Sequence, residues 1–202
     1  MHLTADGELA VFHDDNLKRM TGRDEAIEAL TMAELKTLRL CGTEETIPTL
    51  REALEALDGK VPLILEIKRG AHNDRLCQRV LSTLHGYSGP VCIESFDPFI
   101  VRWWKRNAPE YLRGQLAQPP KDYKGEASPA AAFLAGNLLT NFLCRPHFIA
   151  YRIGSKSITV RLCEAMGAIK AGWTSREWKH ETDYDIVIFE HYKPGVWFRP
   201  VL

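Results

Sequence analysis

A histidine and two acidic residues follow a short apolar run near the start of the chain. Residues 9–12 are all apolar, and His13, Asp14 and Asp15 come directly after them. An uninterrupted apolar run is typical of a strand covered on both faces, as in a parallel α/β sheet. In α/β barrels the carboxyl ends of the strands carry the catalytic groups, so His13 is a candidate for proton transfer. The alternative is a loop histidine that Asp14 caps.

Glu66 and Lys68 stand at the end of a second apolar run, residues 61–67. Their spacing of two places both side chains on the same face of a strand. A charged pair among apolar neighbours must be satisfied by a partner, a metal or an anion. The pattern therefore predicts either a salt bridge at a strand end or a carboxylate ligand for a hard cation beside a phosphate-binding lysine.

The elements that must position these residues alternate between strand and helix. Thr31 with Glu34, and Thr49 with Glu52, have the spacing of capping boxes and predict two helix starts. Further helices are predicted over 74–85, 99–107, 129–143 and 157–166. Strands are predicted near 8–13, 61–67, 91–94, 112–117, 148–151, 168–173 and 186–190. This alternation favours parallel βα units in a single domain, residues 1–202.

Composition excludes several classes of protein. Lys plus Arg and Asp plus Glu number 26 each, so bulk charge gives no reason to expect nucleic-acid binding or a polybasic membrane contact. No apolar run approaches the roughly 20 residues that span a membrane. The five scattered cysteines lack the CxxC spacing of a zinc site and favour a reducing compartment. With no secretory signal at Met1, a cytoplasmic location is expected.

Several short motifs occur together in a recognisable order. They are Thr4-x-Asp-Gly7, Val11-Phe-His-Asp14, Leu17-x-Arg-x-Thr-Gly22, Ile47-Pro-Thr-Leu50 and Leu65-Glu-Ile-Lys68, followed by Ser95-Phe-Asp-Pro98, Arg113-Gly-Gln-Leu116 and Gly172-Trp-Thr174. Together they resemble the glycerophosphodiester phosphodiesterase family. The resemblance covers essentially the whole chain.

The resemblance implies an α/β fold, a (β/α)8 TIM barrel of the PLC-like phosphodiesterase type. It implies hydrolysis of a small-molecule glycerophosphodiester to glycerol 3-phosphate and an alcohol with a divalent cation, Ca²⁺ or Mg²⁺. His13 matches a proton-transfer histidine, Glu66 a metal ligand and Lys68 a phosphate-contacting lysine. Trp173 matches the aromatic residue near the glycerol or head group, with a barrel-lining core tryptophan as the alternative.

Two motifs of the family are not found ahead of Thr4. The family opens with His-Arg-Gly on its first strand and carries Glu-x-Asp on its second. Aligned on Thr4 to Gly7, that aspartate falls immediately before Met1. We therefore expect an incomplete barrel that lacks its first two strands, with further ligands upstream of Met1. Seven predicted strands are one more than this allows, and 148–151 is the expected peripheral one.

Three hypotheses remain open from the sequence. The first is an enzyme whose true start lies upstream of Met1, with impaired activity in this chain. The second is a catalytically dead barrel fragment that binds a phosphate compound or a partner. The third keeps the barrel and the metal chemistry but moves the substrate to another lipid phosphodiester. The open sheet edges of an incomplete barrel also favour a homo-oligomer.

Overall fold

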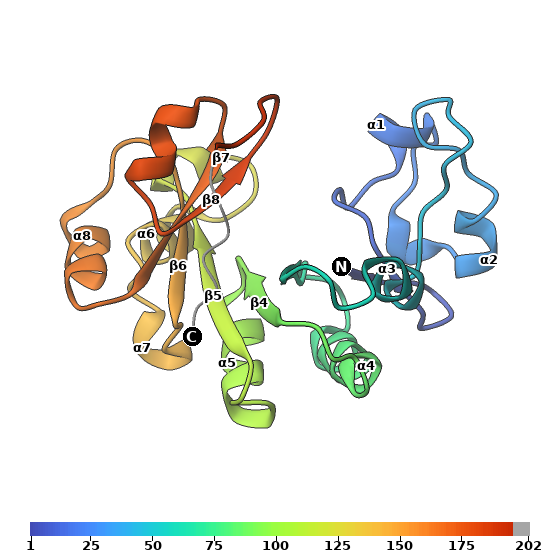
Figure 1. Ribbon diagram of the computed structural model, residues 1–202, viewed down its shortest axis with the longest axis horizontal. Helices are drawn as coiled ribbons and strands as arrows, with labels where there is room; N and C mark the ends of the chain where they lie inside the picture. Colours follow the sequence, from blue (N-terminus) through green and yellow to red (C-terminus); the bar gives the residue numbers. More distant parts are fainter. Residues whose placement is uncertain (196–202) are drawn as a thin grey trace. The chain divides into compact units, whose positions relative to one another are not determined.

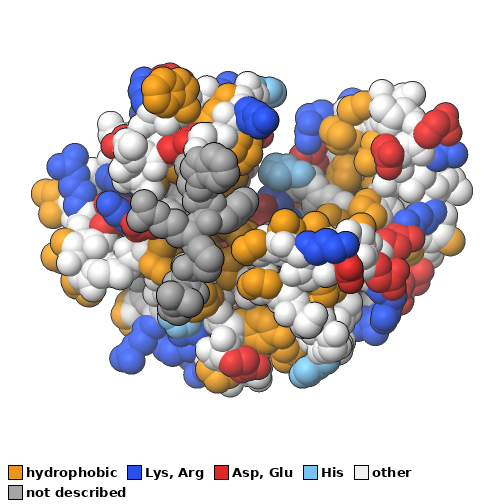
Figure 2. Space-filling view, in the orientation of Figure 1, with side chains coloured by type: hydrophobic (Ala, Val, Ile, Leu, Met, Phe, Trp, Pro, Cys, Tyr) orange, Lys and Arg blue, Asp and Glu red, His pale blue; other side chains and the backbone are white. Residues whose placement is uncertain are grey.

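The computed structural model describes residues 1–195 as two compact units, which divide between Tyr111 and Leu112 (Figure 1). Among residues 1–195, no helix has both the length and the apolar character that a membrane span requires. Positive and negative side chains both occur across the face drawn in Figure 2, in keeping with the balanced charge of the sequence.

The first unit begins with a small antiparallel pair. Strands β1 (His2–Leu3) and β2 (Leu9–Ala10) pair with His2 opposite Ala10. The turn between them includes Gly7, whose φ of 83° lies in the left-handed region where glycine carries no Cβ penalty. The strand expected over 8–13 is thus shorter and antiparallel. It ends at Ala10 because the next residue, Val11, donates its backbone N–H to Pro48 O and not to β1.

A parallel strand pair forms the centre of the first unit. Strands β3 (Leu63–Glu66) and β4 (Val91–Ser95) pair with Leu63 opposite Val91 and Glu66 opposite Glu94. Helix α4 (Asn73–Leu84) joins them, and α5 (Pro98–Asn107) follows β4. The core includes Leu65, Ile67 and Ile93, with Leu76 and Val80 from α4 and Trp104 from α5. Strand period therefore turns Glu66 and Glu94 to the face opposite this core.

Both predicted capping boxes are confirmed. Thr31 begins α2 (Met32–Leu35) and Thr49 begins α3 (Leu50–Leu57), each with reciprocal hydrogen bonds to the glutamate three residues on. The remaining short elements of the first unit are α1 (Lys18–Thr21) and a 3-10 helix (Ile27–Ala29). These elements surround a second apolar cluster that includes Leu17, Ile27 and Leu35.

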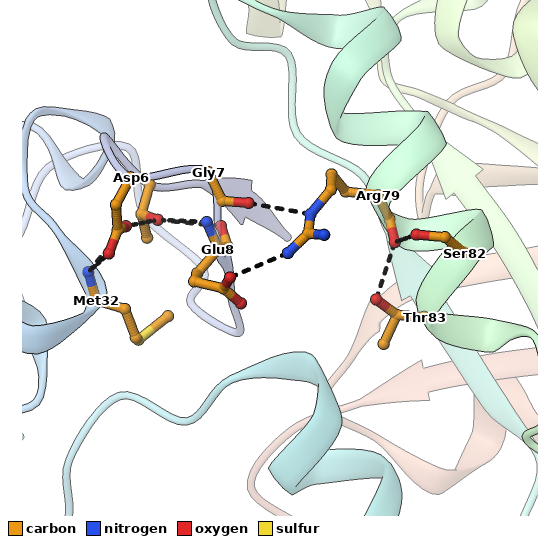
Figure 3. Close-up of polar contacts among 8 residues, drawn as sticks. Asp6, Gly7, Glu8, Met32, Arg79, Ser82 and Thr83 are labelled. Carbon is orange, nitrogen blue, oxygen red and sulfur yellow. Dashed lines mark hydrogen bonds and ion pairs between the residues drawn. The ribbon is translucent and has the colours of Figure 1, made fainter.

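Side-chain contacts hold the Thr4–Gly7 turn from two directions (Figure 3). The Asp6 carboxylate accepts from Met32 N at 3.1 Å, at the start of α2. From α4, Arg79 Nε donates to Gly7 O at 3.1 Å and Arg79 Nη2 to Glu8 Oε1 at 3.0 Å. These contacts fix the turn that carries β1, and so fix the strand on which His2 lies.

The second unit contains four parallel strands in chain order. They are β5 (Leu112–Ala117), β6 (Phe148–Arg152), β7 (Ile169–Ser175) and β8 (Ile186–Phe189). The expectation that 148–151 is peripheral is wrong, because β6 pairs with β5 on one side and β7 on the other. Its residues Ile149 and Tyr151 are buried with Val160 in the core of this unit.

The helix expected over 129–143 is divided in two. Helix α6 (Pro129–Gly136) ends before Leu138, whose φ is 56°, and α7 (Asn141–Cys144) begins after it. The left-handed residue breaks the helical hydrogen-bond pattern while it buries the Leu138 side chain in the core. Helix α8 (Ile158–Ala165) and two 3-10 helices (Pro120–Tyr123 and Trp178–Thr182) complete the unit.

Candidate active site

Glu66 and Lys68 form an ion pair where β3 ends. Lys68 Nζ lies 2.7 Å from Glu66 Oε1, and both side chains are largely buried. The predicted side-by-side placement is therefore correct. A partly buried lysine that faces a carboxylate can also contact an anionic group brought to the same place.

Glu94 lies beside this pair, on the neighbouring strand. It is directly opposite Glu66 in the β3–β4 register and only 5% exposed. Its Oε2 atom has no hydrogen-bond partner among the described residues. Burial and, to a smaller extent, the negative charge of Glu66 raise the pKa of the Glu94 carboxyl to about 8, although Lys68 acts in the opposite direction. Two carboxylates thus share one face of the sheet.

His2 is buried along the other edge of β3. Met1 N donates to Glu66 O at 2.7 Å and Lys68 N donates to Met1 O at 3.2 Å, which aligns the start of the chain with the end of β3. The His2 side chain is almost fully buried, and its Nε2 atom has no hydrogen-bond partner in the described part of the chain. Burial lowers the pKa of His2 to about 3, and the nearby charge of Lys68 contributes in the same direction.

His13 is exposed and oriented by an acidic neighbour. Its Nδ1 atom lies 2.8 Å from Asp14 Oδ1. Arg19 donates to both Asp14 oxygens and, together with His13, lowers the pKa of that carboxyl to about 2. Because an ionised carboxylate only accepts hydrogen bonds, Nδ1 of His13 must carry the proton. The contact between His13 and Asp14 that the alternative interpretation expects is present, and it uses Nδ1 of the ring.

The first unit places Glu66 and Lys68, which the sequence predicted, beside Glu94, which it did not. His13 and Lys68 both act electrostatically on His2, while Glu66 and Lys68 both act on Glu94. Sequence reasoning missed His2 and Glu94. Glu94 could have been found, because it ends a predicted strand just as Glu66 does, and the carboxyl ends of parallel strands meet at one edge. His2 carried no comparable signal, since its burial depends on contacts far along the chain.

Trp173 belongs to the second unit. It lies on β7 opposite Arg152 of β6, and its Nε1 atom donates to Ala150 O at 2.9 Å. The indole N–H is thus already bonded to the neighbouring strand, as expected of a tryptophan that packs on a sheet.

The described residues fit part of a hard-cation site. A calcium or magnesium ion takes about six oxygen ligands, and Glu66 and Glu94 offer carboxylate oxygens on one face, one of them without a partner. Within residues 1–195 there is no cluster of three or more histidine, cysteine or acidic side chains arranged to hold a metal ion. A separate cavity of about 300 Å³ in the first unit is lined by other residues, among them Glu8, Thr49 and Arg79.

Comparison with known proteins identifies the family. A family model, the glycerophosphoryl diester phosphodiesterase family, matches residues 1–193. The chain belongs to this family.

Among individual relatives, the chain is 30% identical over 132 residues to a glycerophosphodiester phosphodiesterase of Caldanaerobacter subterraneus subsp. tengcongensis, a match that covers 58% of this chain and 53% of the relative. It is 34% identical over 98 residues to lysophospholipase D GDPD1 of Rattus norvegicus, with 43% of this chain and 30% of that protein covered. The matches thus span about half, or less, of the curated relatives.

Solved structures establish the fold class. An Oleispira antarctica phosphodiesterase in complex with the product sn-glycerol-3-phosphate superimposes with a TM-score of 0.75 at 24% identity, over 93% of this chain and 77% of that one. A glycerophosphodiester phosphodiesterase of Parabacteroides distasonis gives a TM-score of 0.67 at 21% identity, over 93% and 76%. Together with the parallel strands of both units, these likenesses confirm an incomplete (β/α)8 barrel.

Proposed function

We propose that this chain carries out metal-dependent hydrolysis of glycerophosphodiesters to glycerol 3-phosphate and an alcohol. The observation that carries the proposal is the pair of Lys68 and Glu66 at 2.7 Å, with the Glu94 carboxyl opposite Glu66 in the strand register. Membership of the family supports the proposal. The Oleispira antarctica phosphodiesterase, which has a similar fold, was solved in complex with the product sn-glycerol-3-phosphate, and this supports it too.

The proposed reaction places one demand on each residue. A phosphodiester carries a negative charge, which the Lys68 ammonium attracts. In the proposed hydrolysis a water oxygen forms the new bond to phosphorus and loses its proton to solvent, while the bond to the alcohol oxygen breaks. The departing alkoxide is a poor leaving group, so His13, with both ring nitrogens protonated, gives its Nε2 proton to that oxygen. Asp14 holds the opposite ring nitrogen and keeps Nε2 available. A divalent cation, when bound, neutralises the phosphoryl oxygens, and Glu66 is proposed to hold it. Trp173 is proposed to contact the glycerol or head group.

We further propose that this 202-residue chain is a slow catalyst. The family's His-Arg-Gly and Glu-x-Asp motifs are not found ahead of Thr4. One missing proton-transfer group alone typically lowers a rate by about 10² to 10⁴. A non-catalytic module that binds phosphate compounds is the second candidate, because the described residues hold no cluster of three or more metal-ligating side chains.

Release of glycerol 3-phosphate from glycerophosphocholine tests the proposal. The purified chain is assayed with Ca²⁺, with Mg²⁺ and with EDTA, beside the Lys68→Met variant. Slow turnover that needs a cation and is lost in Lys68→Met is expected. Turnover as fast as that of a complete relative would overturn the proposal of impairment. No turnover, with calorimetric binding of glycerol 3-phosphate retained, would instead establish the non-catalytic module.

A further inference from the structure

Glu94 and Glu66 are paired by the sheet itself. They are direct partners in the parallel β3–β4 register, so their side chains leave the same face of adjacent strands. Leu65, Ile67 and Ile93 alternate with them and lie in the apolar core on the other face. The pairing is therefore fixed by backbone geometry and does not depend on flexible loops.

The two carboxyl groups differ in whether their oxygen atoms have a partner. Lys68 Nζ lies 2.7 Å from Glu66 Oε1, whereas Glu94 Oε2 has no hydrogen-bond partner among residues 1–195. Glu94 is 95% buried, since only 5% of its surface is exposed. Burial of a carboxylate oxygen without a partner is unfavourable, and in native proteins such a group commonly marks a catalytic role or a bound water or ion.

The chemistry of the unpartnered atom indicates what that ligand is. A carboxylate oxygen is an acceptor for a proton donor or a ligand for a hard cation. Cations of this type use oxygen atoms from several elements, and β3 and β4 each present one carboxylate to the same face. A cation would also reduce the repulsion between the two carboxylates.

We propose that Glu94 is a second carboxylate ligand, with Glu66, for a divalent cation. The motif Ser95 to Pro98, which carries the family resemblance at this strand end, begins one residue later and does not include Glu94. The inference rests on the proposed function only in that the chain uses a cation. It adds a ligand that the sequence did not predict.

Calorimetric titration of the purified chain with Ca²⁺ and with Mg²⁺ tests this. The wild type is compared with Glu94→Gln, which keeps the shape but removes the charge, and with Glu110→Gln, an exposed control in the same unit. Removal of a ligand is expected to weaken cation affinity by about tenfold or more, since even groups that only orient ligands matter at the 10- to 100-fold level. The control should bind like the wild type.

A thermal melt in EDTA separates ligation from a purely structural role. If Glu94 is a ligand, metal-free Glu94→Gln should melt at the wild-type temperature or above it, because the amide cannot ionise and so cannot repel the buried Glu66 carboxylate. A lower melting temperature together with unchanged cation affinity would overturn the inference and make Glu94 a structural partner of Lys68. Failure of the wild type to bind either cation at millimolar concentration would also overturn it. Phosphodiester turnover, or binding of glycerol 3-phosphate, is measured separately and reports on the proposed function alone.

Discussion

The two units differ in whether their buried ionisable side chains have hydrogen-bond partners. In the second unit, the buried Arg113 guanidinium donates to Cys144 O at 3.4 Å and to Arg145 O at 3.1 Å, so its polar atoms tie β5 to the end of α7. In the first unit, Glu94 Oε2 and His2 Nε2 are equally buried but have no partner among the described residues. Since buried polar groups are normally paired, the contacts of Arg113 are structural, whereas the unpartnered Oε2 of Glu94 supports the proposal that this carboxyl is a cation ligand.

The largest expected effect concerns proton transfer in the first unit. His13→Ala should lower kcat by about 10² to 10⁴, because the group that protonates the leaving oxygen is removed. Cation affinity should stay nearly unchanged, since His13 is assigned no ligand role. Steady-state kinetics beside calorimetry measures both quantities. Loss of cation binding in His13→Ala would contradict this division of roles, as would recovery of activity with excess cation.

The next largest effect should be on the free energy of unfolding, after substitution of Arg113 in the second unit. Arg113→Met keeps much of the apolar stem but leaves two backbone carbonyls without their donor, so unfolding free energy should fall by about 1–3 kcal/mol. Urea denaturation measures the change, with the exposed Arg161→Met as control. Cation affinity should not change in either variant. An Arg113→Met chain as stable as the wild type would remove the contrast between the two units.

A smaller effect should appear in the acid stability of the first unit. Burial lowers the pKa of His2 from 6.5 to about 3. Between those values the unfolded chain binds the proton and the folded chain does not, so stability decreases as pH falls from about 6.5 toward 3. His2→Gln cannot titrate, and its metal-free unfolding free energy should depend less steeply on pH across this window. Urea melts at several pH values in EDTA measure the slope, and identical slopes for both chains would contradict the assignment.

Local signals in the sequence predicted much of this molecule. The capping boxes at Thr31 and Thr49 are correct because each depends on residues only three positions apart. The strand ending in Glu66 and the Glu66–Lys68 pair follow from strand period alone. The early end of the strand expected over 8–13 was not predicted, because the hydrogen bond from Val11 N to Pro48 O joins distant parts of the chain.

Only the part of the candidate site that depends on local spacing was predicted from the sequence. Strand period placed Glu66 beside Lys68, but only the register of two strands, with α4 between them, sets Glu94 against Glu66. The burial of His2 requires the contact between Met1 and Lys68, which nothing local encodes. The break at Leu138 likewise follows from packing, since the residue itself is a good helix former.

We propose that residues at the carboxyl end of β3 hold a cation that supports phosphodiester hydrolysis. The most direct test of this proposal is Glu66→Gln, followed by calorimetric titration and by release of glycerol 3-phosphate over a range of cation concentrations. The account predicts weakened cation binding, because the amide keeps the shape but lacks the negative charge, and partial recovery of activity with excess cation. A Glu66→Gln chain that binds the cation normally yet stays inactive would contradict it.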